Sequence, residues 1–341
     1  MPGTLRTSSG KSKRMTTKIS AEKTAQMLKN WDNILILCHK NPDGDTLGSG
    51  AGLCHALCNM GKNCKVRCSD AIPEKYDYMK IPLFCGEYEP AHIVAVDVAG
   101  ENLLGDNLSH YRDKIELDLD HHATNSEFAK FLCLKSDYPA AAQLVYEIIL
   151  AMCEKITPLI ADCLHTGILT DTGCFKYPAT TPQTLITAAR LMESGANHKW
   201  LAERFFMQKS AKTVALEKFA LNNLEYGFDG RYALLVLDSK TIAEIQPQTT
   251  DTDGLASFAR DFEGVEVSVL LRQTGENTYK VSVRTSEKAD ATKIACAFGG
   301  GGHVRARGAT ATGNIDDIKK ILTEKVKREL CQQTKQTETE L

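Results

Sequence analysis

Aspartates and histidines stand at the ends of apolar runs in this sequence. The stretch "ILCHKNPDGDTLGSG" shows the arrangement first, because His39, Asp43 and Asp45 follow a smooth apolar run. Three later stretches, "HIVAVDVA", "IELDLDHH" and "GILTDTG", repeat the pattern. The side chains concerned are His39, Asp43, Asp45, Asp97, Asp120, His121, His122 and Asp171.

This donor set has oxygen and imidazole ligands and no thiolate. It therefore suits a hard or borderline divalent cation such as Mn²⁺ or Mg²⁺. Carboxylates crowded together would repel one another without cations. Two ions roughly 3.5–4 Å apart can share one carboxylate, clamp a phosphate and activate water at neutral pH. The pattern predicts a two-metal site that binds a phosphate group and activates water to attack it.

Each aspartate taken alone has a simpler explanation. An acid after a strand is usually a helix cap or a turn former, and this applies to Asp97 and Asp171. Two adjacent histidines at a strand end are costlier to bury without partners. The spacing His39-x-x-x-Asp43-x-Asp45 is rarer still. The occurrence of all these clusters in one chain favours the metal site.

The elements that position these residues are short apolar runs alternating with helical patterns. Strands are expected at 33–39, 64–68, 92–99, 114–122 and 129–135. Helices are expected at 20–30, capped by Ser20, and at 47–61, 141–153 and 159–173. This alternation predicts an α/β fold with a parallel sheet and helices on both faces. Ligands bind at the carboxyl ends of such strands, where three of the clusters fall.

The pattern changes in the second half of the chain. Strands are expected at 231–238, 265–273 and 279–286, the last two joined as a hairpin by "TGEN", and a closing helix at 314–330. We expect a disordered tail over 1–16, a catalytic domain over 17–200 and a helical linker over 201–229. A smaller α/β domain follows over 230–331, and a frayed tail over 332–341.

Composition narrows the class of protein. The chain has 341 residues, 43% of them hydrophobic and 25% charged, as in ordinary globular proteins. The net charge of −2 argues against binding long duplex DNA through phosphate neutralisation alone. None of the twelve cysteines is spaced Cys-x-x-Cys, and no long apolar run is present. We therefore expect a cytoplasmic protein with free thiols and no membrane partner.

At the motifs "HKNPDGD", "VAVDVA", "LDHH" and "GILTDTG" the sequence resembles the DHH phosphoesterase family. The stretch "FGGGGHVRARGAT" is similar to the glycine-rich motif of that family's smaller C-terminal domain. The resemblance covers about residues 20–330. Its branch comprises bifunctional oligoribonucleases, or nanoRNases, that also dephosphorylate 3′-phosphoadenosine 5′-phosphate.

The resemblance implies a role for each motif residue. His39, Asp43 and Asp97 would hold one Mn²⁺, with Mg²⁺ or Co²⁺ as substitutes. Asp97 would bridge to a second ion, whose ligands would be Asp45, Asp97, His121 and Asp171. Asp120 would orient a neighbouring histidine, and His122 would face the scissile phosphate or the leaving group.

The glycine-rich stretch suits an anion. Consecutive glycines let the backbone approach a ligand and present N–H groups to it, although such a run taken alone is more often a flexible turn. Nearby histidine and arginine side chains add phosphate donors. The predicted substrate-binding residues are Arg284, Gly300, Gly301, Gly302, His303, Arg305 and Arg307. Arg305 and Arg307 alternate along a strand-like stretch, so both need not face the ligand.

The resemblance thus implies an enzyme that degrades short single-stranded RNA to mononucleotides and converts 3′-phosphoadenosine 5′-phosphate to AMP. A cleft between the two domains would favour fragments of a few nucleotides, and a homodimer would be unsurprising. Alternatives are a hydrolase of linear di-adenylate (pApA) from cyclic di-AMP turnover, an inorganic pyrophosphatase, and a nucleotide-binding regulator without turnover. The motif "GGGGH" argues against the pyrophosphatase, and the intact ligand set argues against the regulator.

Overall fold

The computed structural model describes residues 15–86, 88–152, 155–247, 251–252 and 254–337. The chain divides into two compact units, residues 1–208 and 209–341. Of the expected tail over 1–16, residues 1–14 lie outside the described residues. Thr16 is held in place, because its hydroxyl donates to the carbonyl of Ala129 at 2.8 Å.

The first unit is built on a parallel sheet with the strand order β1-β6-β5-β4-β2-β3. Its strands are β1 (Thr17–Lys18), β2 (Ile34–Leu37), β3 (Cys64–Arg67), β4 (His92–Val96), β5 (Leu117–Asp120) and β6 (Phe131–Leu134). Its α-helices are α1 (Ala21–Asn30), α2 (Gly44–Asn59), α3 (Ala141–Ala151), α4 (Pro158–Asp171), α5 (Pro182–Glu193) and α6 (His198–Ala202). The α/β fold and the parallel sheet are as predicted.

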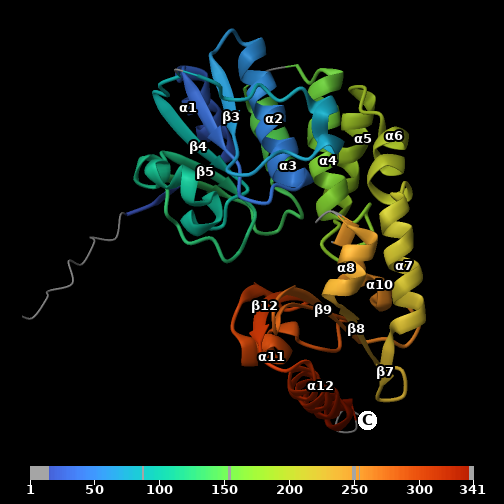
Figure 1. Cartoon of the computed structure of the whole chain (residues 1–341). Coiled ribbons are helices and arrows are strands. Elements are labelled where there is room, and N and C mark those ends of the chain that lie inside the picture. Colours follow the sequence, from blue (N-terminus) through green and yellow to red (C-terminus); the bar gives the residue numbers. More distant parts are fainter. Residues whose placement is uncertain (1–14, 87, 153–154, 248–250, 253, 338–341) are drawn as a thin grey trace, which may run out of the picture. The chain divides into compact units, whose positions relative to one another are not determined.

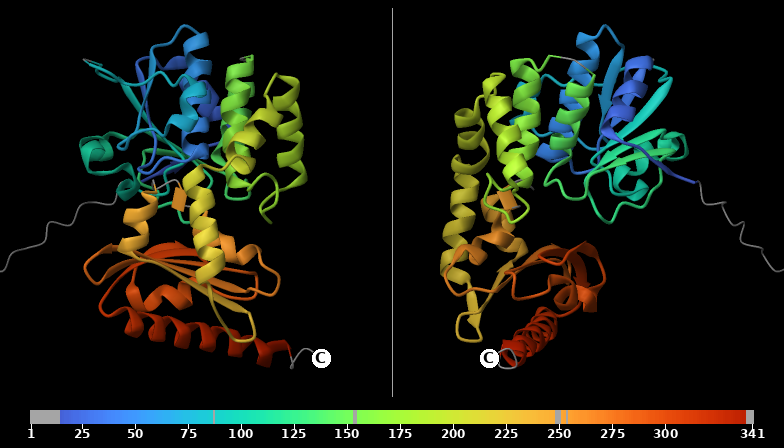
Figure 2. Two further views of the ribbon diagram at one scale, coloured as in Figure 1. Left: turned by 45° about the vertical axis from the view of Figure 1, so that its right-hand side comes forward. Right: turned by 180° about the vertical axis from the view of Figure 1, so that it is seen from behind.

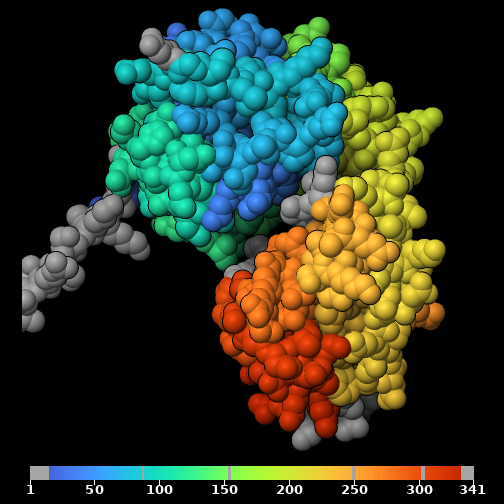
Figure 3. Space-filling view, viewed as in Figure 1, coloured from blue at the N-terminus to red at the C-terminus, as the bar shows by residue number. Residues whose placement is uncertain are grey.

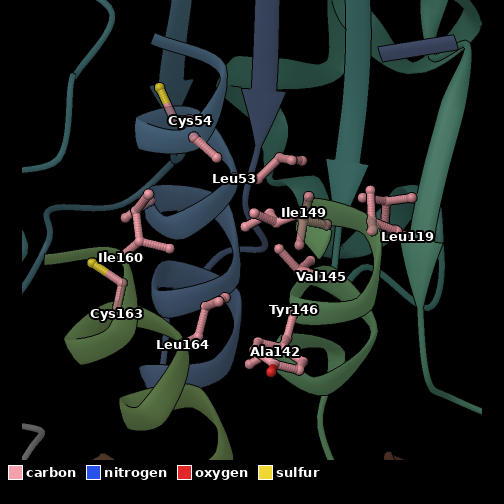
Figure 4. Packing of buried hydrophobic residues seen from close by; sticks show 14 of the residues in the cluster. Leu53, Cys54, Leu119, Ala142, Val145, Tyr146, Ile149, Ile160, Cys163 and Leu164 are labelled. Carbon is pink, nitrogen blue, oxygen red and sulfur yellow. The ribbon is translucent and has the colours of Figure 1, made fainter. Parts of the chain in front are cut away.

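The two faces of this sheet are covered differently. Helices α1 to α4 pack on one face around a core that includes Leu53, Leu119 and Ile149 (Figure 4). The other face is covered by the 3-10 helices η2 (Glu101–Leu104) and η3 (Asp106–Lys114), through residues such as Leu104 and Leu108. The expectation of helices on both faces is met with this difference in helix type.

The segment between β3 and β4 closes the β3 edge of the sheet. It contains the 3-10 helix η1 (Glu74–Met79), and Leu83 then forms a parallel bridge with Val66 of β3. In the space-filling view this segment lies at the surface of the first unit (Figure 3). The first unit ends in η4 (Glu203–Met207), a short π-helix that continues α6.

Local sequence explains the ends of several helices. Ser20 caps α1 as predicted, since its hydroxyl accepts from the backbone N–H of Lys23. Helix α2 begins at Gly44, three residues before the predicted start, because the Asp43 carboxylate accepts from the N–H groups of Asp45 and Thr46. Asp45 therefore lies in the first turn of a helix rather than in a loop.

The second unit has a mixed sheet with the order β11-β12-β10-β9-β8-β7, in which β8 and β9 are parallel. Its strands are β7 (Glu225–Gly227), β8 (Tyr232–Leu237), β9 (Val267–Gly275), β10 (Thr278–Thr285), β11 (Gly301–His303) and β12 (Ala306–Thr312). Its helices are α7 (Ala211–Asn223), α8 (Ser239–Ile245), α10 (Leu255–Phe258), α11 (Ala291–Ala295) and α12 (Ile315–Thr337), with the 3-10 helices η5 (Ala259–Asp261) and η6 (Cys296–Phe298). The predicted β9–β10 hairpin is confirmed.

Helices cover both faces of the second sheet. Helix α12 lies across one face and packs on it through Leu322 and Val326 (Figure 2). Helix α7 packs on the other through Leu216 and Ala220, so this part of the expected 201–229 linker is a packed element of the second unit. Helix α12 runs to Thr337, which extends well into the segment expected to be frayed. Within the described ranges, no helix is both long and apolar enough to cross a lipid bilayer.

Candidate metal centre

Three adjacent strands bring their carboxyl ends to one place. Strands β2, β4 and β5 are neighbours in the sheet, and residues near their carboxyl ends are register partners, Leu37 with Ala95 and Val96 with Leu119. His39 follows β2 closely, Asp97 follows β4 directly, and His121 follows β5 directly. Because the strands are parallel and in register, these side chains converge as the sequence predicts.

Helices supply the remaining acids. Asp43 and Asp45 stand at the start of α2, and Asp171 is the last residue of α4. Asp45 is fully buried, and its carboxylate accepts from the backbone N–H groups of Ala141 at 2.6 Å and Ala142 at 2.9 Å. Helix α3 has no capping side chain of its own, so Asp45 satisfies its first turn from another helix.

Asp97 occupies a backbone conformation that few non-glycine residues adopt. Its φ is 60°, and its amide donates to the carbonyl of Leu119 at 2.9 Å. Strain of this kind clusters at functional sites, where the surrounding structure holds it in place. The carboxylate is 3% exposed, and its Oδ1 has no hydrogen-bond partner. A buried carboxylate oxygen in this state fits a cation ligand.

Two histidines present the same ring nitrogen to the acids. The Nδ1 of His39 lies 2.8 Å from the carbonyl of Lys40, and the Nδ1 of His121 lies 3.1 Å from the carbonyl of Tyr138. A carbonyl only accepts, so each Nδ1 donates, and in the neutral ring the lone pair lies on Nε2. A second hydrogen bond of this type orients most metal-binding histidines. The Nε2 of His121 is buried and makes no hydrogen bond, and the same is true of Asp97 Oδ1.

The ligand atoms form overlapping groups, within each of which all atoms lie within 4.8 Å of one another. One group is His39, Asp43 and Asp97, a second is Asp45, His121 and Asp171, and a third is Asp97, His121 and His122. The Nε2 of His39 lies 3.5 Å from Asp97 Oδ2, and the Nε2 of His121 lies 3.4 Å from Asp97 Oδ1. Each oxygen of Asp97 therefore faces a different histidine, as a bridging carboxylate would require.

Burial and like charge raise the pKa values of two acids. The pKa of Asp45 is raised to about 7, first by burial and then by the charge of Asp97. The pKa of Asp171 is raised well above its ordinary value by burial and by the neighbouring carboxylates. Both effects are those of carboxylates gathered in a site of low dielectric constant. Divalent cations would offset the same repulsion.

The histidines respond in the opposite direction. Burial by itself lowers the pKa of His39, but Asp43 and Asp97 outweigh this and raise it to about 11. Burial also opposes the charge on His121, and the surrounding carboxylates raise its pKa to about 10. Both rings thus experience a strongly negative potential, which is the potential that attracts a cation.

Asp120 holds His122. The Oδ1 of Asp120 lies 2.8 Å from the Nδ1 of His122 and accepts from the N–H of His121 at 2.8 Å. Burial would raise the pKa of Asp120, but these hydrogen bonds outweigh it and lower the pKa. Asp120 is therefore an ionised acceptor, so Nδ1 of His122 carries the proton in this hydrogen bond.

The predicted substrate-binding residues lie together in the second unit, on β10, β11 and β12 and in the turns beside them. Arg307 donates from Nη2 to the carbonyl of Gly300 at 2.8 Å. Gly300 has a φ of 83°, and a Cβ there would lie 2.1 Å from the carbonyl oxygen of Gly308. Glycine is thus required at this position by close backbone approach.

The other predicted substrate-binding residues have different surroundings. Arg305 donates from Nη1 to the carbonyls of Ser286 and Ala289, so that nitrogen serves the fold. Arg284 donates to the carbonyl of Val283 at 3.0 Å. Strand β11 contains Gly301, Gly302 and His303 and pairs with β12, while the His303 side chain lies outside the described part of the chain.

Sequence reasoning missed the residues that hold the ligands in place. Thr46 is fully buried, donates to the carbonyl of Val96 at 3.0 Å and accepts from the N–H of His39. Ser49 donates to Asp45 Oδ1 at 3.1 Å. Their positions in the first turns of α2 are the only sequence signal, because i and i+4 side chains share one helix face.

Known proteins resemble this chain over most of its length. Residues 33–168 match the N-terminal domain of the DHH family, and residues 238–328 match the DHHA1 domain. A Thermus thermophilus protein named "bifunctional oligoribonuclease and PAP phosphatase NrnA" is 32% identical over 322 residues, which are 90% of this chain and 93% of that protein. The Bacillus subtilis protein of the same name is 23% identical, covering 86% of this chain and 94% of its own length.

A solved structure shares the fold. An exopolyphosphatase-related protein from Bacteroides fragilis superposes with a TM-score of 0.83 at 24% identity, covering 90% of this chain and 96% of that one. The chain therefore belongs to the DHH family of phosphoesterases and is a hydrolase of phosphate esters.

Proposed function

We propose that this enzyme degrades short single-stranded oligoribonucleotides to mononucleotides and dephosphorylates 3′-phosphoadenosine 5′-phosphate to AMP, with two Mn²⁺ ions as cofactors. The names of the Thermus and Bacillus relatives support the substrate class. The observation that supports the chemistry best is a pair of buried atoms that make no hydrogen bond, Asp97 Oδ1 and His121 Nε2, where the ligand groups overlap.

The two ions would be held by separate sets that share Asp97. The ligands of the first would be His39, Asp43 and Asp97, and those of the second Asp45, Asp97, His121 and Asp171. Mg²⁺ or Co²⁺ would substitute at the same oxygen and imidazole donors. When bound, such a pair of ions polarises the phosphate and lowers the pKa of metal-bound water to about 7, so that it can act as a nucleophile at neutral pH.

The protein side chains contribute orientation and a proton. Hydrogen bonds to the carbonyls of Lys40 and Tyr138 fix the rings of His39 and His121 before any ligand arrives. His122 is held at Nδ1 by Asp120 and would turn Nε2 toward the phosphate or the leaving oxygen of a bound substrate. A proton on that nitrogen would neutralise the leaving group as the ester bond breaks.

The second unit would hold the rest of the substrate. In this proposal residues 17–200 form the catalytic domain and residues 230–331 the substrate-binding domain. Arg284, Arg307 and the glycines Gly300 to Gly302 would receive a terminal phosphate, with His303 as a further donor and Arg305 supporting the loop. Guanidinium groups and backbone N–H groups are the donors that phosphate prefers.

A product profile tests the proposal. Purified protein with Mn²⁺ would be incubated separately with pApA, a five-nucleotide RNA, 3′-phosphoadenosine 5′-phosphate and pyrophosphate, with Asp97→Ala and His121→Ala as controls. We expect mononucleotides from both RNAs and AMP from 3′-phosphoadenosine 5′-phosphate, all lost in both variants. Omitting Mn²⁺, or replacing it with Mg²⁺ or Co²⁺, ranks the cofactors.

Other outcomes identify the alternatives. Hydrolysis of pApA without hydrolysis of the longer RNA would point to a di-adenylate hydrolase. Phosphate from pyrophosphate alone would overturn the proposed role of the second unit while leaving the metal centre intact. Nucleotide binding without turnover in any metal would contradict the catalytic proposal itself.

A further inference from the structure

Asn125 lies behind the ligand residues, in the turn that follows β5. Its Nδ2 donates to two carboxylates at once, to Asp120 Oδ2 at 2.6 Å and to Asp118 Oδ2 at 2.8 Å. A longer contact of 3.4 Å joins the same nitrogen to the carbonyl of Val98, next to Asp97. One amide group thus connects the turn after β5 with the turn after β4.

The orientation of this amide is determined by its surroundings. The Oδ1 of Asn125 accepts from the backbone N–H of Glu127 at 2.8 Å. The flipped amide would place a second donor against that N–H and would leave the carboxylates of Asp118 and Asp120 facing a carbonyl oxygen. The network therefore assigns oxygen and nitrogen unambiguously.

The two oxygens of Asp120 have different partners. Asn125 holds Oδ2, whereas Oδ1 holds His122 Nδ1 and the N–H of His121. We propose that Asn125 is a positioning residue for the reaction, which fixes the Asp120 carboxylate and, through it, the ring of His122. The inference rests on the role proposed above for His122.

Asp118 completes the arrangement from inside the sheet. It is fully buried in β5, and Asn125 is its hydrogen-bonding neighbour at Oδ2. An asparagine at this position would still present an acceptor oxygen to Asn125 Nδ2, whereas a leucine, which is also branched at Cγ, would present none. Asp118 acts by keeping the amide of Asn125 in place between two acceptors.

The test compares variants of the full-length Mn²⁺ enzyme on pApA. Asn125→Asp keeps the shape but replaces a donor by an acceptor, and Asn125→Ala removes the side chain. We expect kcat to fall by about 10- to 100-fold in both, as for other residues that orient active-site groups, with KM and the affinity for Mn²⁺ alone changed little. Asp118→Asn should keep kcat near that of the wild type, and Asp118→Leu should not. The exposed Asn223→Ala serves as the control for mutation and handling.

A double-mutant cycle with His122→Ala separates positioning from a merely structural role. If Asn125 acts through His122, adding Asn125→Ala to His122→Ala should reduce kcat little further. Full additivity, or a loss of Mn²⁺ affinity that matches the loss of kcat, would overturn the inference. Wild-type kcat in Asn125→Asp would also overturn it. If His122→Ala alone leaves kcat unchanged, the proposed role of His122 fails instead.

Discussion

At the scale of single residues, Asp97 combines an uncommon backbone conformation with a buried carboxylate. Its backbone adopts a φ of 60°, and its buried carboxylate faces both His39 and His121. Asparagine tolerates this backbone region better than most residues. The substitution Asp97→Asn therefore removes a charge without forcing the turn to change.

We expect Asp97→Asn to lower kcat by at least about 100-fold, the scale at which a single electrostatic contact to a transition state is lost. The same variant without metal should also lower the pKa values of His39 and His121, because the Asp97 carboxylate is one of the groups that raise them. Activity assays with Mn²⁺ and NMR titration of the two histidines with a chelator measure the two effects. Unchanged pKa values of both rings would contradict this account of Asp97.

His165 offers a second test at the same scale, away from the metal ligands. It is fully buried in α4, with Nε2 3.0 Å from His198 Nδ1. Burial and, to a lesser extent, His198 lower its pKa from 6.5 to about 4. Between these values the unfolded chain binds a proton that the folded chain does not. The neutral, buried His165 therefore makes its full contribution to the free energy of unfolding above pH 6.5, and this contribution is lost as the pH falls toward 4.

Replacing His165 should make the free energy of unfolding depend less on pH. The contribution amounts to at most about 3 kcal/mol, given about 1.4 kcal/mol for each pKa unit. Urea unfolding at pH 7.5 and pH 5 should show a smaller acid-induced loss of stability in His165→Gln than in the wild type. The exposed His110→Gln should keep the wild-type loss. Parallel curves for His165→Gln and the wild type would disprove the assignment.

At the scale of elements, the closeness of α2 and α4 sets the geometry of the centre. Gly44, Gly48 and Gly52 recur every four residues along α2 and face α4. A Cβ on Gly48 would lie 2.3 Å from the carbonyl oxygen of Cys163, and one on Gly44 would lie 2.4 Å from the Thr170 hydroxyl. The stretch "GSGAG" resembles a dinucleotide fingerprint only loosely. Gly48 and Gly52 serve helix packing, and a Cβ on Gly50 would face Cys38 and Ile36 instead.

We expect Gly48→Ala to destabilise the fold by about 1–3 kcal/mol, the usual cost of overpacking against backbone. It should also weaken Mn²⁺ binding, because α4 carries Asp171 and would be pushed away from α2. Gly254→Ala is the matched control, since its φ is −73° and nothing lies within 4 Å of the added Cβ. If Gly48→Ala were destabilised but bound Mn²⁺ with unchanged affinity, the packing of α2 on α4 would not determine the geometry of the metal centre.

The elements also show how far sequence reasoning reaches. The sequence predicts that His39, Asp97 and His121 lie close together, because alternating strand and helix patterns imply a parallel sheet whose strand ends meet. The contact of Asp45 with α3 could not be predicted, since nothing at Ala140 signals a missing cap. Nor could the 3-10 helices on the second face, whose short turns lack the periodicity of an α-helix.

The hydrogen bonds of Asn125 could not be predicted from the sequence, for a related reason. Its contacts depend on the course of a turn rather than on the period of an element. The glycine-rich motif was expected to let the backbone approach a ligand, and this stays a prediction. The close approach that the structure describes is to backbone, since a Cβ on Gly300 would lie 2.1 Å from the carbonyl oxygen of Gly308. The sequence could not show which backbone carbonyls the arginines reach, Ala289 for Arg305 and Gly300 for Arg307, because these contacts depend on the fold.

At the scale of the whole molecule, each unit has a core of its own. The clusters built on the parallel sheet and those built on the mixed sheet have no residue in common. Every proposed metal ligand belongs to the first unit, and every proposed substrate-binding residue belongs to the second. Metal binding and substrate holding should therefore be separable.

A fragment of residues 15–208 should fold cooperatively and bind Mn²⁺ within about threefold of the affinity of the full chain, as expected for a unit with its own core. It should hydrolyse bis-p-nitrophenyl phosphate but lose preference for short RNA, because the phosphate-binding residues are absent. Circular dichroism, calorimetry with Mn²⁺ and substrate competition measure these properties. A folded fragment that keeps full selectivity for short RNA would contradict the role proposed for the second unit.

The contact between Asp45 and the start of α3 has an evolutionary consequence. A capping acid is worth about 0.5–2 kcal/mol to a helix, and Asp45 provides it to α3 whether or not a metal is bound. Asp171 has no such second task in the described contacts. In descendants that abandon hydrolysis, selection for folding alone should retain Asp45 long after Asp171 has drifted. An aspartate at this position is thus a poor marker of activity, and the last residue of α4 is a better one.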